Sequence, residues 1–214
     1  MNAPALQRRR LYVDANYASP YAMSVFVALR EKALDFDIVT LDLVTGAHHS
    51  PVFAGLSLTH RVPTLVDGTF ALSESSAITE YLDERYPGSG LYPQDVQTKA
   101  RARQLQAWLR SDLVPIREER PTFVIFYGPS SEPLSPTAIA AAERLFAAID
   151  SLLPVGAENL FGSWTIADTD VALMLNRLVM NGDAVPLRLA EYARKQWQRP
   201  TVQIWAKMNR PPRP

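Results

Sequence analysis

The distribution of strand-like and helix-like segments constrains the fold of this chain more than any other feature of its sequence. Short runs of β-forming residues alternate with helical patterns up to Tyr86, whereas the chain after Pro87-Gly88-Ser89-Gly90 shows almost only helical periodicity. A length of 214 residues allows one large domain or two small ones, because domains hold about 100–200 residues each. We therefore predict a small α/β domain over residues 1–86, a linker over residues 87–94 and an all-helical domain over residues 95–214.

The first part has the order strand, helix, strand, then a hairpin and a helix. Ser19-Pro20 favours a helix start, because serine caps the first backbone N–H groups and proline loses nothing at the first helical position. Asp67-Gly68 marks a hairpin turn. A further helix begins at Ser73 or Ser75. The predicted strands cover residues 11–13, 36–43, 63–66 and 70–72. This order indicates a mixed sheet with helices on its faces.

The second part is predicted to be helical throughout. Apolar residues at helical spacing indicate helices over residues 94–116, 136–153, 165–180, 186–196 and 201–208. Thr165-Ile166-Ala167-Asp168 has the form of a capping box, which we interpret as structural. Residues 123–126 form the one run here with strand character, and the proline-rich end over residues 210–214 is predicted to be frayed.

Composition excludes several classes of function. The chain carries 22 Lys and Arg against 22 Asp and Glu, so no overall charge attracts nucleic acid or an anionic membrane. It has no cysteine, which excludes disulfides, thiolate metal sites and a cysteine nucleophile. Three histidines without an HExxH motif or a carboxylate cluster argue against a metal site. A signal-peptide core is missing and no run approaches roughly 18 apolar residues, so we expect a soluble cytoplasmic protein.

Three positions place polar groups at expected helix or strand starts. Ser19 lies among backbone N–H groups at a helix N-terminus, where an anion such as a carboxylate, phosphate or thiolate is stabilised. Glu74 and Ser75 follow a strand and suit a zwitterion, since the carboxylate attracts an ammonium and the hydroxyl a carboxylate. Val62-Pro63 opens a strand, in which a cis proline would turn the Val62 backbone toward an extended ligand. Each also has a structural interpretation, as a helix cap or a strand start.

The remaining candidates have equally simple interpretations. His48 belongs to a His-His pair in a loop that we expect to be solvated. Arg117 lies in a run of alternating charge typical of a solvated helix end. Trp108 and Phe123 belong to core-like patterns, although their place near the domain junction leaves a ligand pocket open.

Together these motifs resemble those of the cytosolic glutathione transferases over nearly the whole chain. The resemblance rests on four motifs in order, which are Ser19-Pro20-Tyr21, Val62-Pro63, Ser73-Glu74-Ser75-Ser76-Ala77-Ile78 and Thr165-Ile166-Ala167-Asp168. It implies a thioredoxin-like N-terminal domain followed by an all-helical domain. Residues 100–121 resemble the bacterial YfcF-type subgroup, with a serine-type site. The chain departs from the pattern at Ser57-Leu58, where many members have Asn-Pro.

The resemblance also implies a role for each candidate residue. Ser19 would donate its hydroxyl proton to the glutathione sulfur and stabilise the thiolate. Val62, before a cis Pro63, would pair its backbone with the cysteinyl part of glutathione. Glu74 and Ser75 would hold the γ-glutamyl end. The glycyl carboxylate would contact His48, assisted by Arg61. Trp108, Arg117 and Phe123 would line the electrophile pocket.

The implied function is conjugation of glutathione, as co-substrate and without a metal, to a small hydrophobic electrophile, in detoxification or oxidative stress. One alternative is a glutathione-dependent peroxidase or disulfide-bond reductase that uses the same thiolate on a peroxide or a mixed disulfide. Another is an interaction or stress-response module without catalysis. Members of the family usually form homodimers, so the resemblance also implies a homodimer. We expect neither nucleic acid nor a membrane as partner.

Overall fold

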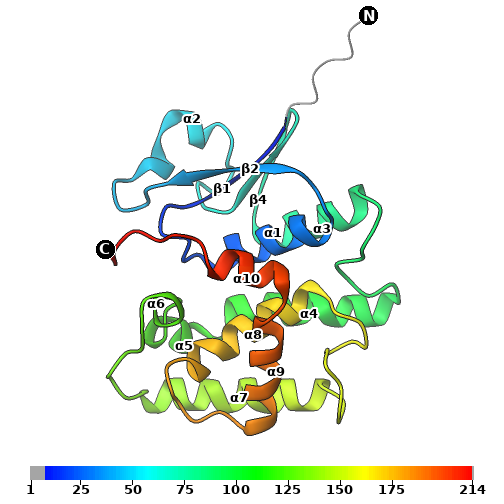
Figure 1. The fold of residues 1–214 in the computed structure, drawn as a ribbon, viewed down its shortest axis with the longest axis vertical. Helices are drawn as coiled ribbons and strands as arrows, with labels where there is room; N and C mark the ends of the chain where they lie inside the picture. Colours follow the sequence, from blue (N-terminus) through cyan, green and yellow to red (C-terminus); the bar gives the residue numbers. More distant parts are fainter. Residues whose placement is uncertain (1–7, 214) are drawn as a thin grey trace, which may run out of the picture. The chain divides into compact units, whose positions relative to one another are not determined.

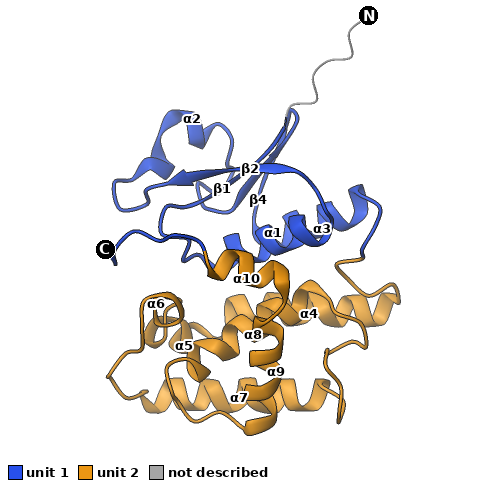
Figure 2. Cartoon of the chain, in the orientation of Figure 1, with its two compact units in different colours: residues 1–89, 208–214 blue, residues 90–207 orange. Residues whose placement is uncertain are grey.

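The computed structural model describes residues 8–213, which form two compact units (Figure 2). The first unit runs to Ser89 and includes the chain again from Met208, and the second runs from Gly90 to Lys207. The end of the chain was predicted to belong to the helical domain and to be frayed. Instead the chain from Met208 onward groups with the first unit, and Arg210 donates a hydrogen bond to the carbonyl of Tyr17 at 3.2 Å, while residues 211–213 are exposed.

The first unit is built on a four-stranded mixed sheet, in the order β2-β1-β3-β4 (Figure 1). Its strands are β1 (Arg9–Asp14), β2 (Phe36–Leu41), β3 (Thr64–Asp67) and β4 (Phe70–Ser73). β1 runs parallel to β2 and antiparallel to β3, and β4 runs antiparallel to β3. The hairpin between β3 and β4 is confirmed. Its turn contains Gly68 at φ +64°, a conformation that glycine adopts without steric cost.

Helices cover both faces of this sheet. α1 (Pro20–Glu31) and α3 (Ser75–Arg85) pack together on one face, while η1 (Ala47–His49) and α2 (Pro51–Ala54) lie on the other (Figure 1). Side chains alternate between the two faces of β1, as the period of a strand requires. Leu11 and Val13 are fully buried, and the ring of Tyr12 between them lies 5.5 Å from that of Phe53 in α2. The first unit is therefore a thioredoxin-like domain, as predicted.

The second unit is helical. Its helices are α4 (Val96–Ser111), α5 (Val114–Glu119), α6 (Phe123–Phe126), α7 (Pro136–Leu152), α8 (Ile166–Val179), α9 (Leu187–Trp197) and α10 (Pro200–Ala206). α8 lies at the centre, because every side chain from Ile166 to Leu178 except Asp170 is buried. A helix that is buried all round belongs to the core of its domain. Within residues 8–213, no helix has both the length and the apolar character needed to span a membrane.

The start of α8 forms the capping box that the sequence indicates. The fully buried carboxylate of Asp168 accepts hydrogen bonds from the backbone N–H groups of Leu160 and Thr165, both at 2.8 Å. It also accepts the hydroxyls of Thr165 at 3.0 Å and Tyr192 at 2.9 Å. Burial raises the pKa of Asp168 in spite of these bonds. The interpretation of this motif as structural is consistent with a carboxylate enclosed by its own unit.

Two local predictions in the second unit were wrong. The long helix expected over residues 94–116 is interrupted after Ser111, because Pro115 has no N–H to continue the α4 ladder and instead stands in the first turn of α5. Residues 123–126 form one turn of helix, α6, rather than a strand. The backbone N–H groups of Ile125 and Phe126 both bond to the carbonyl of Thr122, so the segment satisfies its own backbone without a partner strand.

Candidate functional site

Four segments of the first unit meet at one edge of the sheet. The pairs Asp14–Leu41, Tyr12–Thr64 and Thr64–Ser73 place the ends of β1, β2 and β4 beside the start of β3. The segments that leave or enter the sheet there carry, in chain order, Ser19, His48, Arg61-Val62-Pro63 and Glu74-Ser75. All residues predicted to contact glutathione thus emerge from the same edge, although 56 positions separate the first from the last.

Ser19 is the N-cap of α1. Its Oγ accepts the backbone N–H of Ala22 at 3.2 Å, and Pro20 occupies the first turn of the helix. A hydroxyl that accepts one hydrogen bond still has its own proton to donate. The half-buried Ser19 therefore presents one O–H donor beside the positive end of the α1 dipole. This arrangement stabilises an anion placed against the hydroxyl.

Glu74 has an unusual backbone conformation with a positive φ angle. It precedes the first residue of α3 and has φ 72° and ψ 114°, a backbone conformation that residues other than glycine rarely adopt. Such positions cost free energy and cluster at functional sites. The Glu74 side chain is exposed, whereas Ser75 is buried at the start of the helix. The pair presents a carboxylate to solvent next to a hydroxyl and a helix N-terminus.

His48 and Arg61 lie on a common hollow of about 500 Å³ in the first unit. Its lining residues are His48, His49, Leu58, Thr59, His60 and Arg61, which include all three histidines of the chain and no carboxylate. The Nδ1 atom of His48 is buried and makes no hydrogen bond with the described residues, and its ring lies 3.9 Å from that of His49. A hollow lined by three histidines and an arginine, without a carboxylate, suits an anionic group such as a carboxylate.

The segment before β3 is tied down by Ser57. Its buried hydroxyl accepts the backbone N–H of Arg61 at 3.3 Å and the hydroxyl of Thr64 at 2.9 Å. The peptide bond between Val62 and Pro63 is cis, as the resemblance implied. Ser57 stands where many relatives were expected to have asparagine, and here its hydroxyl holds the two ends of the turn together. Nothing in the sequence singled out this role.

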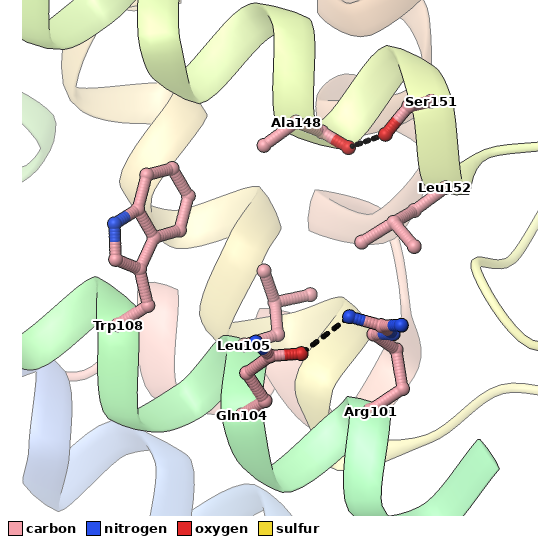
Figure 3. Close-up of a pocket in the computed structure, with 7 residues that line it drawn as sticks. All are labelled: Arg101, Gln104, Leu105, Trp108, Ala148, Ser151 and Leu152. Carbon is pink, nitrogen blue, oxygen red and sulfur yellow. Dashed lines mark hydrogen bonds between the residues drawn. The ribbon is translucent and has the colours of Figure 1, made fainter. Parts of the chain in front are cut away.

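Trp108 lines a cavity of about 310 Å³ in the second unit (Figure 3). α4 contributes Arg101, Gln104, Leu105 and Trp108, and α7 contributes Ala148, Ser151 and Leu152. The indole lies at one end, while the guanidinium of Arg101 lies at the other and donates to Oε1 of Gln104 at 2.5 Å (Figure 3). A cavity of this size, with apolar walls and a few polar groups, is typical of small-molecule sites.

The other two residues predicted for an electrophile pocket do not line this cavity. Arg117 lies in α5 and donates from Nη2 to the carbonyl of Arg110 at 2.8 Å. Phe123 lies in α6 and stacks on Tyr127, with ring centroids 5.2 Å apart and planes 29° apart. The cavity therefore brings together Trp108 and residues of α7 that the sequence did not single out.

Asp14 is the contact of Ser19 that sequence reasoning missed. Its carboxylate is buried and accepts the backbone N–H of Ser19 at 3.0 Å. In the sequence it is only the charged residue that ends an apolar run. The sequence does not show that Asp14 is buried, because its burial depends on the loop that closes over the end of the strand.

Among the described residues, no group of three or more His, Asp or Glu side chains is placed to hold a metal ion.

Comparison with known proteins agrees with this geometry in both units. The family model described as glutathione S-transferase, N-terminal domain, matches residues 15–90, and the model described as glutathione S-transferase, C-terminal domain, matches residues 95–209. The second match alone covers more than half of the chain. The protein therefore belongs to the glutathione S-transferase family.

Individual relatives support the same assignment. A crystal structure of a glutathione transferase homolog from Burkholderia, with bound glutathione, is 47% identical and has a TM-score of 0.76, covering 94% of this chain and 97% of that one. A tau class glutathione S-transferase from mango, at 21% identity with a TM-score of 0.75, covers 95% of this chain and 94% of its own and shares the fold. Human glutathione S-transferase theta-1 is 35% identical over 136 residues, which are 61% of this chain and 55% of the human protein. The match thus spans about half the length of that curated relative.

Proposed function

We propose that this protein activates the thiol of glutathione as a thiolate and transfers it to a small hydrophobic electrophile. The observation that carries the proposal is the common sheet edge from which Ser19, His48, Val62 and Glu74 emerge. A homolog that is 47% identical over 94% of this chain was crystallised with glutathione bound, which supports the choice of ligand.

Ser19 would stabilise the thiolate directly. A free thiol has a pKa of about 8.5, so only a small fraction is ionised at neutral pH. The Ser19 O–H donates to the sulfur while its Oγ keeps the bond from Ala22, and the α1 dipole acts in the same direction. A decrease of the thiol pKa by one unit amounts to about 1.4 kcal/mol and raises the ionised fraction nearly tenfold. The intrinsic nucleophilicity falls as the pKa falls, so the gain in rate is smaller.

The two ends of the tripeptide would be held by opposite charges. The exposed carboxylate of Glu74 pairs with the γ-glutamyl ammonium, and the N-terminus of α3 at Ser75 receives the neighbouring carboxylate. The basic hollow with His48 and Arg61 receives the glycyl carboxylate. The backbone of Val62 pairs with the cysteinyl residue between them.

In the conjugation step, the thiolate attacks an electrophilic carbon and forms a C–S bond. With a chlorinated aromatic substrate, the C–Cl bond breaks and chloride leaves with the electron pair. The proton lost from the thiol passes to solvent. We propose that the electrophile is recognised in the helical unit, with Trp108 as the principal contact because it lines a cavity of suitable size, and with Arg117 and Phe123 as secondary candidates.

The test begins with binding of glutathione by calorimetry, followed by turnover of a chlorinated aromatic and of cumene hydroperoxide. We expect micromolar to millimolar binding and conjugation of the aromatic. Turnover of the hydroperoxide without conjugation would replace the proposal by the peroxidase or reductase alternative, which uses the same thiolate. Absence of both binding and turnover would leave an interaction module.

We further propose, on the family resemblance, a homodimer that works in the cytoplasm and belongs to the YfcF-type subgroup with a serine-type site. Light scattering on the purified protein tests the dimer, since the chain mass is 23.9 kDa and a dimer doubles it. A monomeric mass at working concentration would contradict this part without affecting the chemistry of Ser19.

A further inference from the structure

The loop between β1 and α1 carries Ser19 but forms no regular secondary structure of its own. Its backbone groups must nevertheless find hydrogen-bond partners, because the loop is largely buried or half-buried. Tyr17 in this loop has φ +49°, which is uncommon for a residue other than glycine. A conformation of this kind persists only where surrounding contacts determine it.

Asp14 supplies three of these contacts. Asp14, the last residue of β1, is only 6% exposed. Its Oδ2 accepts the N–H of Ala18 at 2.7 Å, its Oδ1 accepts the N–H of Ser19 at 3.0 Å, and its backbone carbonyl accepts the N–H of Tyr17 at 3.0 Å. Asp14 therefore holds three consecutive backbone donors, the last of which belongs to Ser19 itself.

The opposite side of the loop is held by the end of the chain. The guanidinium of Arg210 donates to the carbonyl of Tyr17 at 3.2 Å and to that of Met208 at 3.0 Å. The loop is thus fixed through its donors by Asp14 and through its central carbonyl by Arg210.

We propose that Asp14 is a positioning residue for the reaction, which acts by fixing the place of Ser19 Oγ and does not touch glutathione. This inference rests on the proposed function of Ser19. An O–H donor stabilises a thiolate strongly only at hydrogen-bond distance and in line with the sulfur. A displacement of about 1 Å at a catalytic group can lower the rate by up to about 100-fold, even when the lost contact lies away from the reacting atoms.

A purely electrostatic effect of Asp14 has the opposite sign. A carboxylate near a developing anion raises the pKa of that anion's acid, so loss of its charge would lower the pKa of the bound thiol. A positioning role predicts that the same substitution raises the thiol pKa, because the Ser19 hydroxyl no longer meets the sulfur. The direction in which the thiol pKa changes therefore distinguishes a positioning role of Asp14 from a purely electrostatic one.

The experiment compares wild type with Asp14→Asn, which keeps size and one acceptor oxygen but removes the charge and the second acceptor. The thiol pKa of bound glutathione is titrated from the ultraviolet absorbance of the thiolate, and kcat and KM are measured with a chlorinated aromatic. We expect a higher thiol pKa, a kcat about tenfold lower and a KM for glutathione within about twofold of wild type. Asp95→Asn is the matched control, since Asp95 also accepts a backbone N–H, from Thr98 at 2.8 Å, but in the second unit.

A thiol pKa in Asp14→Asn that equals or falls below that of wild type overturns the inference. If this variant does not fold, as judged by circular dichroism, Asp14→Ser takes its place, because a hydroxyl keeps one acceptor without the bulk. Ser19→Ala is measured in parallel. If wild-type protein does not lower the thiol pKa of bound glutathione, or if Ser19→Ala leaves that pKa unchanged, the proposed function fails. If Ser19→Ala raises the thiol pKa and the Asp14 variants do not, only the positioning role of Asp14 fails.

Discussion

Helices α1 and α7 begin in the same way, yet the serines that cap them have different neighbours. Ser19 opens α1 and Ser135 opens α7, each is followed by proline, and each Oγ accepts a backbone N–H three residues further on at 3.2 Å. The hydroxyl of Ser135 donates to Glu119 at 2.5 Å, so its proton is used inside the second unit. Ser19 instead stands at the sheet edge with the other candidate residues. A local motif thus acquires a use only from its tertiary surroundings.

The starts of α3 and α8 show a similar contrast between polar groups left exposed and polar groups satisfied inside their own unit. α8 begins with a complete capping box, in which the buried Asp168 receives four hydrogen bonds. α3 begins after the strained backbone of Glu74, whose side chain makes no capping bond and is exposed. At α8 the second unit satisfies the polar groups of a helix start internally, whereas at α3 the first unit leaves a carboxylate exposed beside a strained backbone, at a cost in local stability.

The largest expected effect is on stability, at Asp168. Asp168→Ala leaves the buried N–H groups of Leu160 and Thr165 and the hydroxyl of Tyr192 without their acceptor. We expect the free energy of unfolding to fall by about 3–5 kcal/mol, measured by chemical denaturation. The thiol pKa of glutathione bound to the remaining folded protein should stay at the wild-type value. A shifted thiol pKa would show that this helix start also serves the site.

The next effect is on catalysis, at Ser19. Ser19→Ala removes one donor to the developing thiolate, and we expect kcat/KM for conjugation to fall about 100-fold. The thiol pKa of bound glutathione should rise toward its value of about 8.5 in free thiols. Loss of the cap should also lower the free energy of unfolding by about 1 kcal/mol.

Ser135→Ala is the control for Ser19→Ala. It removes a capping bond of the same length in the second unit and should cost at least as much stability, about 1 kcal/mol, with kcat/KM unchanged. If both variants lose activity in proportion to their loss of stability, Ser19 is a helix cap and nothing more.

A smaller effect is expected at Glu74. Glu74→Gln keeps the shape of the side chain but turns a charge-assisted hydrogen bond to the γ-glutamyl ammonium into a neutral one. We expect the KM for glutathione to rise roughly tenfold, with kcat at saturation within about twofold of wild type. Glu143→Gln, at an exposed position of α7, is the comparison. An equal rise of KM in both would remove Glu74 from the site.

The smallest effect is expected at the end of the chain. Arg210→Ala removes one hydrogen bond to the carbonyl of Tyr17 while Asp14 still holds the loop. We expect kcat/KM to fall about twofold to tenfold, measured with a chlorinated aromatic under the same conditions as wild type. Lys207→Ala, an exposed cation three residues earlier, should have no effect. A larger loss than that of Asp14→Asn would make the chain end, and not Asp14, the principal support of the loop.

The fold class followed from local patterns because each pattern has a local cause. The short apolar run at residues 11–13, the Asp67-Gly68 turn and the capping box at Asp168 all act over a few residues, and all three predictions are confirmed. The break between α4 and α5 had a local signal in Pro115, which the helical pattern on either side outweighed. No local pattern indicated the turn of helix at residues 123–126, because a run of four aromatic and β-branched residues suits a strand as well as a helix.

The sequence by itself determined that a thiol-free chain begins a helix at Ser19, enters a strand at Pro63 and starts another helix beside Glu74. Those features are set by propensity, capping and turn chemistry within a few residues of each position. Only the tertiary structure decided that they share one sheet edge, that Asp14 is buried beneath Ser19, and that Arg210 reaches Tyr17 across 193 positions. Such contacts depend on strand register and on how the chain closes over its own ends, and no short stretch of residues records either.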